Sequence, residues 1–240
     1  MHDKNKKDDR GYNQGWADSY STRVRAERRC DALIASMQVE PGRNILEIGC
    51  GTGDIAFMLA QKTNMQVLGT DLCVPFIEEA RKEFIHPTLR YDILDFNKIA
   101  EFKENRFDYI VGNGILHHLY YHLDEALVNL RLLLKPGGKI IFWEPNIYNP
   151  YIYLIFSYAT LRKKASLEPD EMAFSKPFIE AKLRKAGFSE VAVSYRDFLL
   201  PGIPDVLIKP SVIIGNVLEK IPLINKVSQS IFIEASNKKN

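Results

Sequence analysis

The sequence predicts an α/β fold: a single, doubly wound sheet of seven strands, mostly parallel, with helices on both faces. Short apolar runs alternate with segments of helical periodicity, and each pair takes roughly 20 to 25 residues, the spacing of β-α-β units. The runs are continuously apolar, as is typical of parallel strands that helices cover on both sides. A chain of 240 residues, 46% of them hydrophobic, is large enough to bury the core of such a domain.

The predicted elements follow one another along the chain. The segment from Trp16 to Met37 combines apolar and small residues with arginines, which indicates one or two amphipathic helices ended by Pro41-Gly42. Aliphatic runs that end at a glycine or an acidic residue indicate strands, and the periodic segments after them indicate helices. The predicted strands are 44–48, 66–70, 89–91, 107–111, 139–143, 191–195 and 230–235, and the predicted helices are 54–62, 76–84, 123–134 and 177–186.

Two segments depart from this alternation. Residues 146–161 carry five aromatic rings and precede the basic run Arg162-Lys163-Lys164, whereas residues 198–224 are apolar but interrupted by four prolines. Neither contains the roughly 20 consecutive apolar residues that would span a membrane. We therefore expect a flexible tail at 1–11 and one domain at 12–240. Its core is expected at 43–143, with capping elements at 12–40, 144–176 and 198–228.

The charge and cysteine content argue against several classes of protein. Thirty-two basic residues and thirty acidic ones leave a net charge of +2, too weak a field to predict a nucleic-acid partner. The three cysteines are odd in number and lack CxxC spacing, so neither a disulfide framework nor a cysteine-rich zinc site is expected. The charged N-terminus lacks the apolar core of a signal peptide. Together these features predict a cytoplasmic protein.

A glycine-rich loop comes directly after the first predicted strand, in the stretch Glu47-Ile-Gly-Cys-Gly-Thr-Gly-Asp54. Glycines at 49, 51 and 53 let the backbone turn tightly and approach a ligand. Dinucleotide enzymes place their glycines as G-x-G-x-x-G/A, and here the last of those positions is Asp54. The loop therefore disfavours nicotinamide and flavin dinucleotides.

Further motifs come after this loop in order. Asp71 ends the second predicted strand, Asp92 comes after the third, residues 107–119 read FDYIVGNGILHHL and residues 134–142 read LKPGGKIIF. Over residues 43–143 the set resembles the class I S-adenosylmethionine-dependent methyltransferases, within them the small type 11 group. The resemblance implies a Rossmann-like methyltransferase fold with an aromatic cap insertion after the fifth strand. It also implies S-adenosylmethionine as cofactor and S-adenosylhomocysteine as product.

The chemistry of that cofactor agrees with these residues. A sulfonium, a ribose diol and an amino acid tail need hydrogen-bond acceptors and a backbone that approaches the ligand closely. The resemblance places Asp71 on the ribose hydroxyls and Asp92 on the adenine amino group, although Asp71 could instead cap the next helix. Asn113 would contact the methionine moiety or order its loop, and Tyr20 would cover the cofactor or belong to the core. The expected cofactor-binding residues are Glu47, Gly49, Cys50, Gly51, Gly53, Asp71, Leu72, Asp92, Ile93, Asn113 and Tyr20.

Methyl transfer from a sulfonium is an in-line displacement, and a hydroxyl acceptor also needs a general base. In the family the loop after the fourth strand faces the methyl group, and here it carries His117 and His118. We assign the base to His118, with His117 as the alternative; both could instead pack against the next helix. Glu144 would contact the acceptor or order the chain after the fifth strand. No metal is expected, because the i, i+4 pair His118 and His122 has no convincing third ligand.

The residues after the fourth strand narrow the choice of acceptor. Asn113-Gly-Ile-Leu116 stands where enzymes that methylate nucleobase amines carry an Asn/Asp-Pro-Pro-Tyr motif, so no nucleic acid is expected. The capping segments favour a small, lipid-like or secondary-metabolite acceptor, methylated at oxygen, nitrogen or carbon. The segment 147–164 would cap the pocket or lie peripherally at a membrane surface. The alternatives are a non-catalytic scaffold that binds the cofactor and a nicotinamide oxidoreductase, and the oligomeric state stays open.

Overall fold

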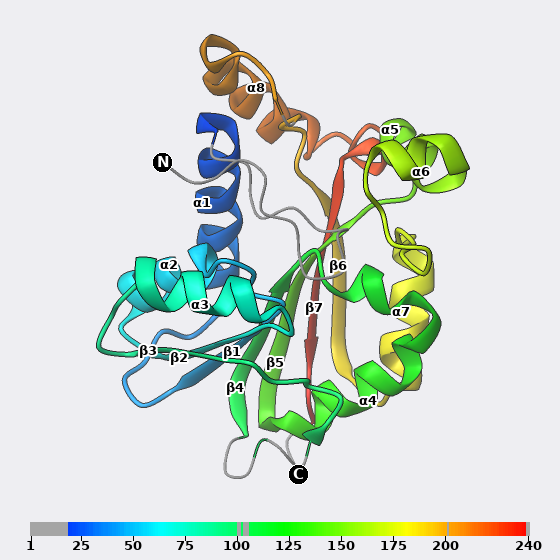
Figure 1. Cartoon of the computed structure of the whole chain (residues 1–240). Coiled ribbons are helices and arrows are strands. Elements are labelled where there is room, and N and C mark those ends of the chain that lie inside the picture. The colour runs from blue at the N-terminus through cyan, green and yellow to red at the C-terminus, as the bar shows by residue number, and fades with distance from the viewer. Residues whose placement is uncertain (1–18, 100–101, 103–105, 201, 239–240) are drawn as a thin grey trace.

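The computed structural model describes residues 19–99, 102, 106–200 and 202–238 (Figure 1). The strands are β1 (Asn44–Ile48), β2 (Gln66–Thr70), β3 (Leu89–Asp92), β4 (Phe107–Asn113), β5 (Leu134–Pro145), β6 (Ser189–Arg196) and β7 (Ser230–Ser236). The helices are α1 (Tyr20–Ala35), α2 (Asp54–Thr63), α3 (Val74–Glu83), α4 (Leu123–Leu133), α5 (Pro150–Ser157), α6 (Ala159–Lys164), α7 (Lys176–Lys185) and α8 (Asp205–Leu218), with the 3-10 segments η2 (Leu116–His122) and η3 (Asn225–Val227).

The seven strands form one sheet in the order β3-β2-β1-β4-β5-β7-β6. The first five are mutually parallel, and β7 runs antiparallel to both of its neighbours, which makes β6 parallel to β5. The predicted seven-stranded, mostly parallel sheet is confirmed. The chain winds outward first from β1 to β3 and then from β4 to the opposite edge. Open sheets of this kind bind ligands at the carboxyl ends of the strands where the winding reverses, here between β1 and β4.

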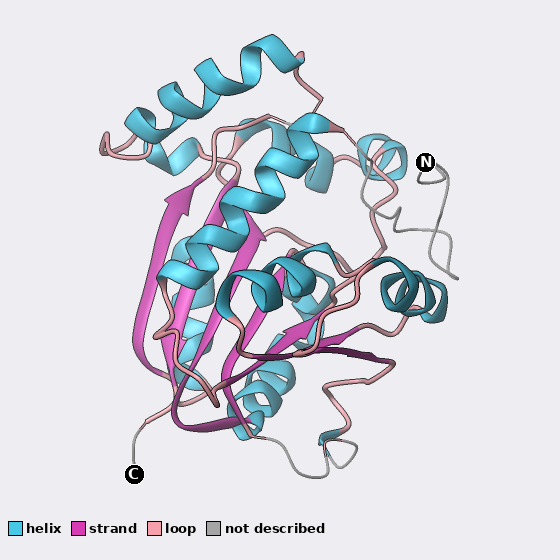
Figure 2. Ribbon diagram, turned by 90° about the vertical axis from the view of Figure 1, so that its left-hand side faces the viewer, coloured by secondary structure: helices cyan, strands magenta, loops and turns pink. Residues whose placement is uncertain are grey.

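Helices cover both faces of the sheet (Figures 1 and 2). Helices α1, α2 and α3 pack on one face around a buried cluster that includes Leu33, Ile45 and Leu59. Helices α4 and α7 pack on the other face around a cluster that includes Leu127 and Leu183. The central strands are apolar on both sides, so the two clusters pack against opposite faces of one sheet.

Three parts of the chain differ from the prediction by more than a few residues or in kind. Helix α1 begins at Tyr20, where the Ser19 hydroxyl accepts the Thr22 N–H (3.2 Å); Trp16 and the predicted tail at 1–11 lie outside the described residues. Strand β5 begins at Leu134, well before the predicted 139–143. Pro210, one of the four prolines in 198–224, lies inside α8, a helix for which no bounds were predicted. Proline has no N–H to donate to the carbonyl of the preceding helical turn. That turn is solvent-exposed, so water can hydrogen-bond to the carbonyl instead.

The predicted aromatic insertion after β5 is helical. The Asn149 side chain accepts the N–H groups of Tyr151 and Ile152 and so caps α5, with Pro150 at its first position. The Asn149-Pro150-Tyr151 segment therefore begins this helix. Helices α5, α6 and α8 all lie at the end of the molecule where the parallel strands end (Figure 1). Among the described residues, each helix is too short or too polar to cross a bilayer.

Candidate active site

The glycine loop lies at the carboxyl end of β1, in the reversal of the winding. Gly49, Gly51 and Gly53 all have positive φ. At Gly53 (φ 92°) a Cβ would lie 2.6 Å from the Tyr91 hydroxyl, and that hydroxyl donates to the Gly53 carbonyl (3.0 Å). At Gly51 (φ 54°) a Cβ would meet nothing within 4 Å, so the backbone there borders open space. The loop is thus held in place by Tyr91 at Gly53, and its backbone is accessible to a ligand at Gly51.

Asp71, directly after β2, is bonded to this loop. The Gly51 N–H donates to its Oδ2 (2.9 Å) and the Cys73 N–H to its Oδ1 (2.8 Å). Leu72 beside it is 62% exposed, an unusual position for a large apolar side chain. The structure therefore brings Asp71 and Leu72 to the glycine loop as the sequence predicts, with an apolar surface free for a planar ring.

Asp92 ends β3 next to Asp71, because the Asp71 N–H donates to the Asp92 carbonyl (3.4 Å). Its side chain is 55% exposed, accepts the Ile93 N–H (2.8 Å) and lies 3.4 Å from Arg81. Ile93 is 38% exposed. Leu72 and Ile93 thus leave two apolar side chains in solvent at adjacent strand ends, which suits an adenine ring more than a charged ligand.

The side chains of Glu47 and Cys50, within the glycine-rich stretch, are buried. Burial, reinforced by the charges of Asp54 and Asp71, raises the pKa of Glu47 to about 8. Its Oε2 has no hydrogen-bond partner among the described residues. Burial likewise raises the pKa of Cys50 well above its usual value, so its thiol is protonated at neutral pH and is not a nucleophile.

These residues fit S-adenosylmethionine. The orphaned carboxyl oxygen of Glu47 lies at a loop whose backbone borders open space, so a ligand with a cationic or amino group would supply the missing partner. Asp71 keeps lone pairs for a ribose diol after its two backbone bonds. When bound, the cofactor supplies the electrophilic methyl group, and this loop with Asp71, Leu72 and Ile93 would hold its nucleoside.

Glu144 holds the loop after β4. Its carboxylate is 1% exposed and accepts three consecutive backbone N–H groups, from Ile115 (3.1 Å), Leu116 (2.7 Å) and His117 (3.2 Å). The same carboxylate lies 2.8 Å from Nδ1 of His117. A carboxylate only accepts, so Nδ1 carries the proton and Nε2 keeps its lone pair, with Oε2 of Glu171 4.0 Å from it. Glu144 thus fixes both the loop and the tautomer of His117.

His118 is held differently. Its Nδ1 lies 2.9 Å from Glu171 and 3.6 Å from Glu168. Burial opposes the charged ring, but the hydrogen bonds and charges of Glu168 and Glu171 outweigh it and raise the pKa of His118 to about 9. The ring is therefore an imidazolium at neutral pH and cannot accept a proton. The raised pKa of His118 favours His117 over His118 as general base, and the local sequence carried no sign of the two carboxylates because they come from a distant segment.

The two histidines and Glu171 also form a group of side chains that could bind a metal ion. In the described part of the chain, His117, His118 and Glu171 each offer one ligand atom, and these atoms all lie within 4.8 Å of one another. His122, the expected partner of His118, is not in the group. No metal is expected from the sequence, and among the described residues this trio is the one group that could hold an ion. We interpret it as an ion pair, because His118 already compensates Glu171, which lies 2.9 Å away.

Asn113 and Tyr20 have different surroundings. Asn113 ends β4, and its Oδ1 accepts from Nη1 of Arg29 (2.6 Å), which ties it to α1. Its contact with the methionine moiety stays a prediction. Tyr20 is the first residue of α1 and is 43% exposed, so it is not part of the core. Its role as a cover for the cofactor also stays a prediction.

Sequence reasoning missed two buried acids at this edge. Glu171 is 3% exposed, and the N–H of Met172 beside it donates to the His117 carbonyl (3.1 Å). Asp197 is 2% exposed and pairs with arginines of α1. Neither acid belongs to a motif; the one signal was the density of arginines in α1, which requires a counterion somewhere in the fold.

Comparisons with known proteins agree with this site. A family model described as a methyltransferase domain matches residues 46–140. The highly reducing polyketide synthase easB of Emericella nidulans is 29% identical over 175 residues, 66% of this chain, and the chain spans only 7% of that synthase. The ubiquinone/menaquinone biosynthesis C-methyltransferase UbiE of Desulfotalea psychrophila is 27% identical over 72% of this chain and 76% of its own length.

The fold is shared with solved structures. Phosphoethanolamine N-methyltransferase 2 of Haemonchus contortus, crystallised with S-adenosyl-L-methionine, superposes with a TM-score of 0.61 at 17% identity, over 89% of this chain and 53% of its own. The matched domain, the order of the strands in the sheet and the position of the glycine loop thus all indicate the same fold. Residues 46–140 thus match a methyltransferase domain, and the chain has the fold of the class I S-adenosylmethionine-dependent methyltransferases, whose cofactor the residues of the glycine loop fit.

Proposed function

We propose that the protein methylates an acceptor atom, carbon or oxygen, that must lose a proton during the transfer, and that His117 is the general base. The observation that carries this is the His117–Glu144 pair, with 2.8 Å between Nδ1 and the carboxylate. An amine acceptor that arrives neutral needs no such base. A carbon acid or a hydroxyl does, and the pair is arranged as a base held by an orienting carboxylate.

The residues have distinct tasks in this reaction. His117 takes the acceptor proton on Nε2, and the electron pair left on carbon or oxygen forms the new bond to the methyl carbon as the carbon–sulfur bond breaks. Glu144 stabilises the imidazolium that forms, since its carboxylate is buried and already directed at Nδ1. The methylated acceptor and S-adenosylhomocysteine leave, and the proton passes from His117 to solvent.

Among such acceptors, the relatives favour a carbon acid. One relative is named as a C-methyltransferase of quinone biosynthesis, and another is a reducing polyketide synthase. Both names point to carbon next to a carbonyl or a phenolic oxygen, where a single base suffices to form the nucleophile. We therefore place a small or lipid-like carbonyl or phenol compound first among acceptors. The structural neighbour phosphoethanolamine N-methyltransferase 2, which is named for transfer to nitrogen, does not share this preference for carbon.

A transfer assay with a labelled methyl group tests this function. We expect label in a β-keto thioester, a phenol or a quinol, and none in a primary amine of similar size. Product mass and fragmentation identify the methylated atom. Transfer to amines alone would refute the proposal, and cofactor binding without transfer to any of these compounds would favour the non-catalytic scaffold.

We also propose that the protein acts in the cytoplasm, at the surface of a membrane that carries the acceptor. Helix α8 supports this, because Val206 (80% exposed), Ile213 (66%) and Val217 (55%) lie on one side of it in solvent. Lys209 and Lys220 are exposed in the same segment. An apolar helix face with flanking lysines suits an anionic lipid surface.

Helix α5 extends the same surface. Tyr151 (53% exposed), Tyr153 (52%) and Leu154 (44%) lie in solvent, and exposed Lys163 and Lys164 come next in α6. Because α5, α6 and α8 lie at one end of the molecule (Figure 1), they could meet one bilayer together. The segment predicted either to cap the pocket or to lie on a membrane would then do both.

Sedimentation with lipid vesicles tests this surface. We expect the protein to sediment with vesicles containing phosphatidylglycerol at low salt and to be released at high salt, because the lysine contribution is screened. Ile213→Glu should abolish sedimentation. The control is Leu132→Glu, a side chain that is 46% exposed on α4, the helix at the opposite end of the molecule in Figure 1. Wild-type protein that stays in the supernatant would make α5 and α8 a pocket cap only.

A further inference from the structure

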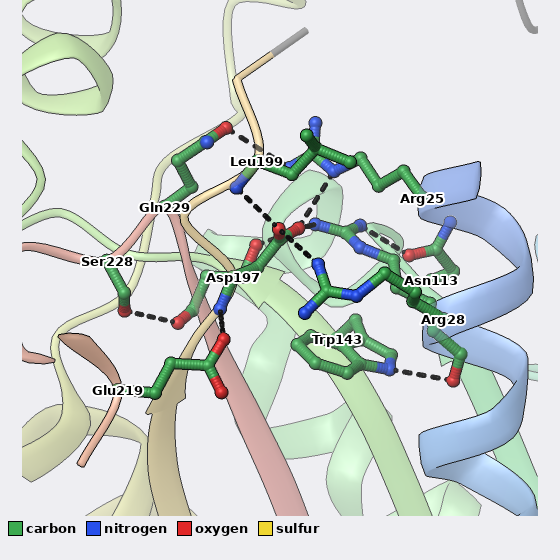
Figure 3. Close-up of polar contacts among 11 residues, drawn as sticks. Arg25, Arg28, Asn113, Trp143, Asp197, Leu199, Glu219, Ser228 and Gln229 are labelled. Atoms are coloured by element: carbon green, nitrogen blue, oxygen red, sulfur yellow. Dashed lines mark hydrogen bonds and ion pairs between the residues drawn. The ribbon is translucent and has the colours of Figure 1, made fainter. Parts of the chain in front are cut away.

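A cavity lined by arginines lies between α1, the ends of β5 and β6, and α8. Its volume is about 170 Å³. Arg25, Arg28 and Arg29 of α1 line one side, and Arg196 and Asp197 at the end of β6 line another. Figure 3 shows the α1 side chains converging on Asp197 beside the ring of Trp143. Charged side chains thus dominate the lining of a small volume.

The arginines exceed their counterions. Nε of Arg25 and Nη2 of Arg29 each lie 2.9 Å from Oδ2 of Asp197, and Nη1 of Arg28 lies 3.8 Å from Oδ1. The other acid of the lining, Glu219, accepts the backbone N–H of Asp197 (2.8 Å). Within the lining, four arginines thus face two carboxylates, an excess of two positive charges, and the buried Glu144 is a third acid that acts on Arg29 from outside the lining. An ion-pair network that only joined α1 to β6 would need no such excess.

Two buried donors in the network around Asp197 also lack partners. Nε of Arg29 and Nε2 of Gln229 make no hydrogen bond within the described structure. Gln229 belongs to the same network, because its Oε1 lies 3.4 Å from Nη2 of Arg25. Burial and the neighbouring charge of Arg25 lower the pKa of Arg29 to about 10, against the opposing influence of Asp197. Unused donors and surplus positive charge together call for an anion.

The position of the cavity distinguishes it from the cofactor loop. In the sheet, β5 is two strands from β1 and β6 is four strands away. Neighbouring strands lie about 4.8 Å apart, so the cavity begins about 10 Å from the glycine loop and ends about 19 Å from it. The adenosine-side residues Asp71 and Asp92 lie still farther, after β2 and β3. Arg29 reaches back to Asn113 (2.6 Å) at the end of β4, which connects the cavity to the reaction centre.

We propose that this cavity binds an anionic oxygen group of the acceptor, a carboxylate or a phosphate, and so positions the acceptor beside the loop of His117. The proposal rests on the methyltransferase function proposed above and names a chemical feature of its substrate. Arginine is suited to the task because its planar guanidinium donates two parallel hydrogen bonds to such groups. A charged anchor on one side and an apolar surface on α8 on the other would select amphipathic anions.

Inorganic phosphate is the probe for this site. The fluorescence of Trp143, which lines the cavity, is followed in a Trp16→Phe background, so that one tryptophan remains. The titration uses protein saturated with S-adenosylhomocysteine, whose own carboxylate then occupies its place. We expect phosphate to change the signal saturably, and Arg28→Gln to raise the Kd at least about tenfold. Arg23→Gln, an exposed arginine of α1 outside the cavity lining, is the charge-matched control.

The outcomes separate the alternatives. An equal loss of phosphate affinity in the Arg23 variant would mean general charge attraction and would overturn the site. Phosphate that binds only without S-adenosylhomocysteine would assign the cavity to the cofactor carboxylate and overturn the acceptor assignment. If Arg28→Gln does not fold, Asn216→Ala, which removes the acceptor of the Arg28 Nη2 bond (2.8 Å), replaces it. Failure of the base mechanism appears in variants of His117 and leaves phosphate binding unchanged, so the two proposals fail separately.

Discussion

His117→Gln is expected to lower kcat by roughly 10² to 10⁴-fold, the usual contribution of a positioned general base. Glutamine retains a side-chain donor for Glu144 but has no basic nitrogen at the position of Nε2. The backbone N–H groups of residues 115–117 still bond to Glu144, so the loop and the cofactor pocket are preserved. We therefore expect an unchanged Kd for S-adenosylhomocysteine, measured by calorimetry, together with the loss of turnover in the labelled-methyl assay.

His118→Gln is the matched control for this experiment. It removes an imidazolium that pairs with Glu171 (2.9 Å), so it should lower stability and loosen the segment around residue 171 without removing the base. Turnover by the folded variant should stay within about tenfold of the wild type. If instead His118→Gln abolished turnover and His117→Gln did not, the base would be His118 in spite of its raised pKa.

Asp71→Ala is expected to weaken cofactor binding by roughly 10 to 150-fold. The carboxylate organises the glycine loop through the Gly51 N–H (2.9 Å) and, in the family, accepts the ribose hydroxyls. Loss of one charge-assisted hydrogen bond costs about 1.5 to 3 kcal/mol, which corresponds to that range of Kd. Both S-adenosylmethionine and S-adenosylhomocysteine should be affected alike, because the change lies at the nucleoside and not at sulfur. Calorimetric titration measures it.

Asp92→Ala serves as the comparison for Asp71→Ala. The Asp92 carboxylate is 55% exposed and bonds to the N–H of the next residue, so its removal leaves the glycine loop intact. We expect at most about a tenfold change in Kd, since a solvent-exposed bond contributes less. Thermal unfolding shows whether either variant is globally destabilised. Equal affinities for wild type and Asp71→Ala would remove Asp71 from the cofactor site.

Much of the fold was predictable because its signals are local. The apolar runs of β1, β2 and β4 are each five to seven residues long and buried, and the structure has them at or near their predicted bounds. The glycine loop and Asp71 were predictable for the same reason, since a turn with positive φ and the end of a strand are encoded by neighbouring residues. The cofactor was predictable from their order.

The general base could not be assigned from local sequence signals. His117 and His118 are adjacent, and nothing in their immediate sequence distinguishes them. Glu144 lies 27 residues beyond His117 and reaches it because β5 pairs with β4, whereas Glu171 approaches His118 from the segment before α7. A pKa depends on charges and burial in space, and these come from elements that are distant along the chain.

The sequence by itself determined the α/β class, the seven strands, the glycine loop and the cofactor family. Tertiary structure decided which carboxylate each histidine contacts, that Glu144 fixes the loop after β4, that α8 persists through Pro210 with an exposed apolar face, and that arginines of α1 gather around Asp197. The physical reason is the range of the interactions. Turn geometry and apolar periodicity act between neighbours in sequence, whereas hydrogen bonding, burial and charge act between groups that only the completed sheet brings together.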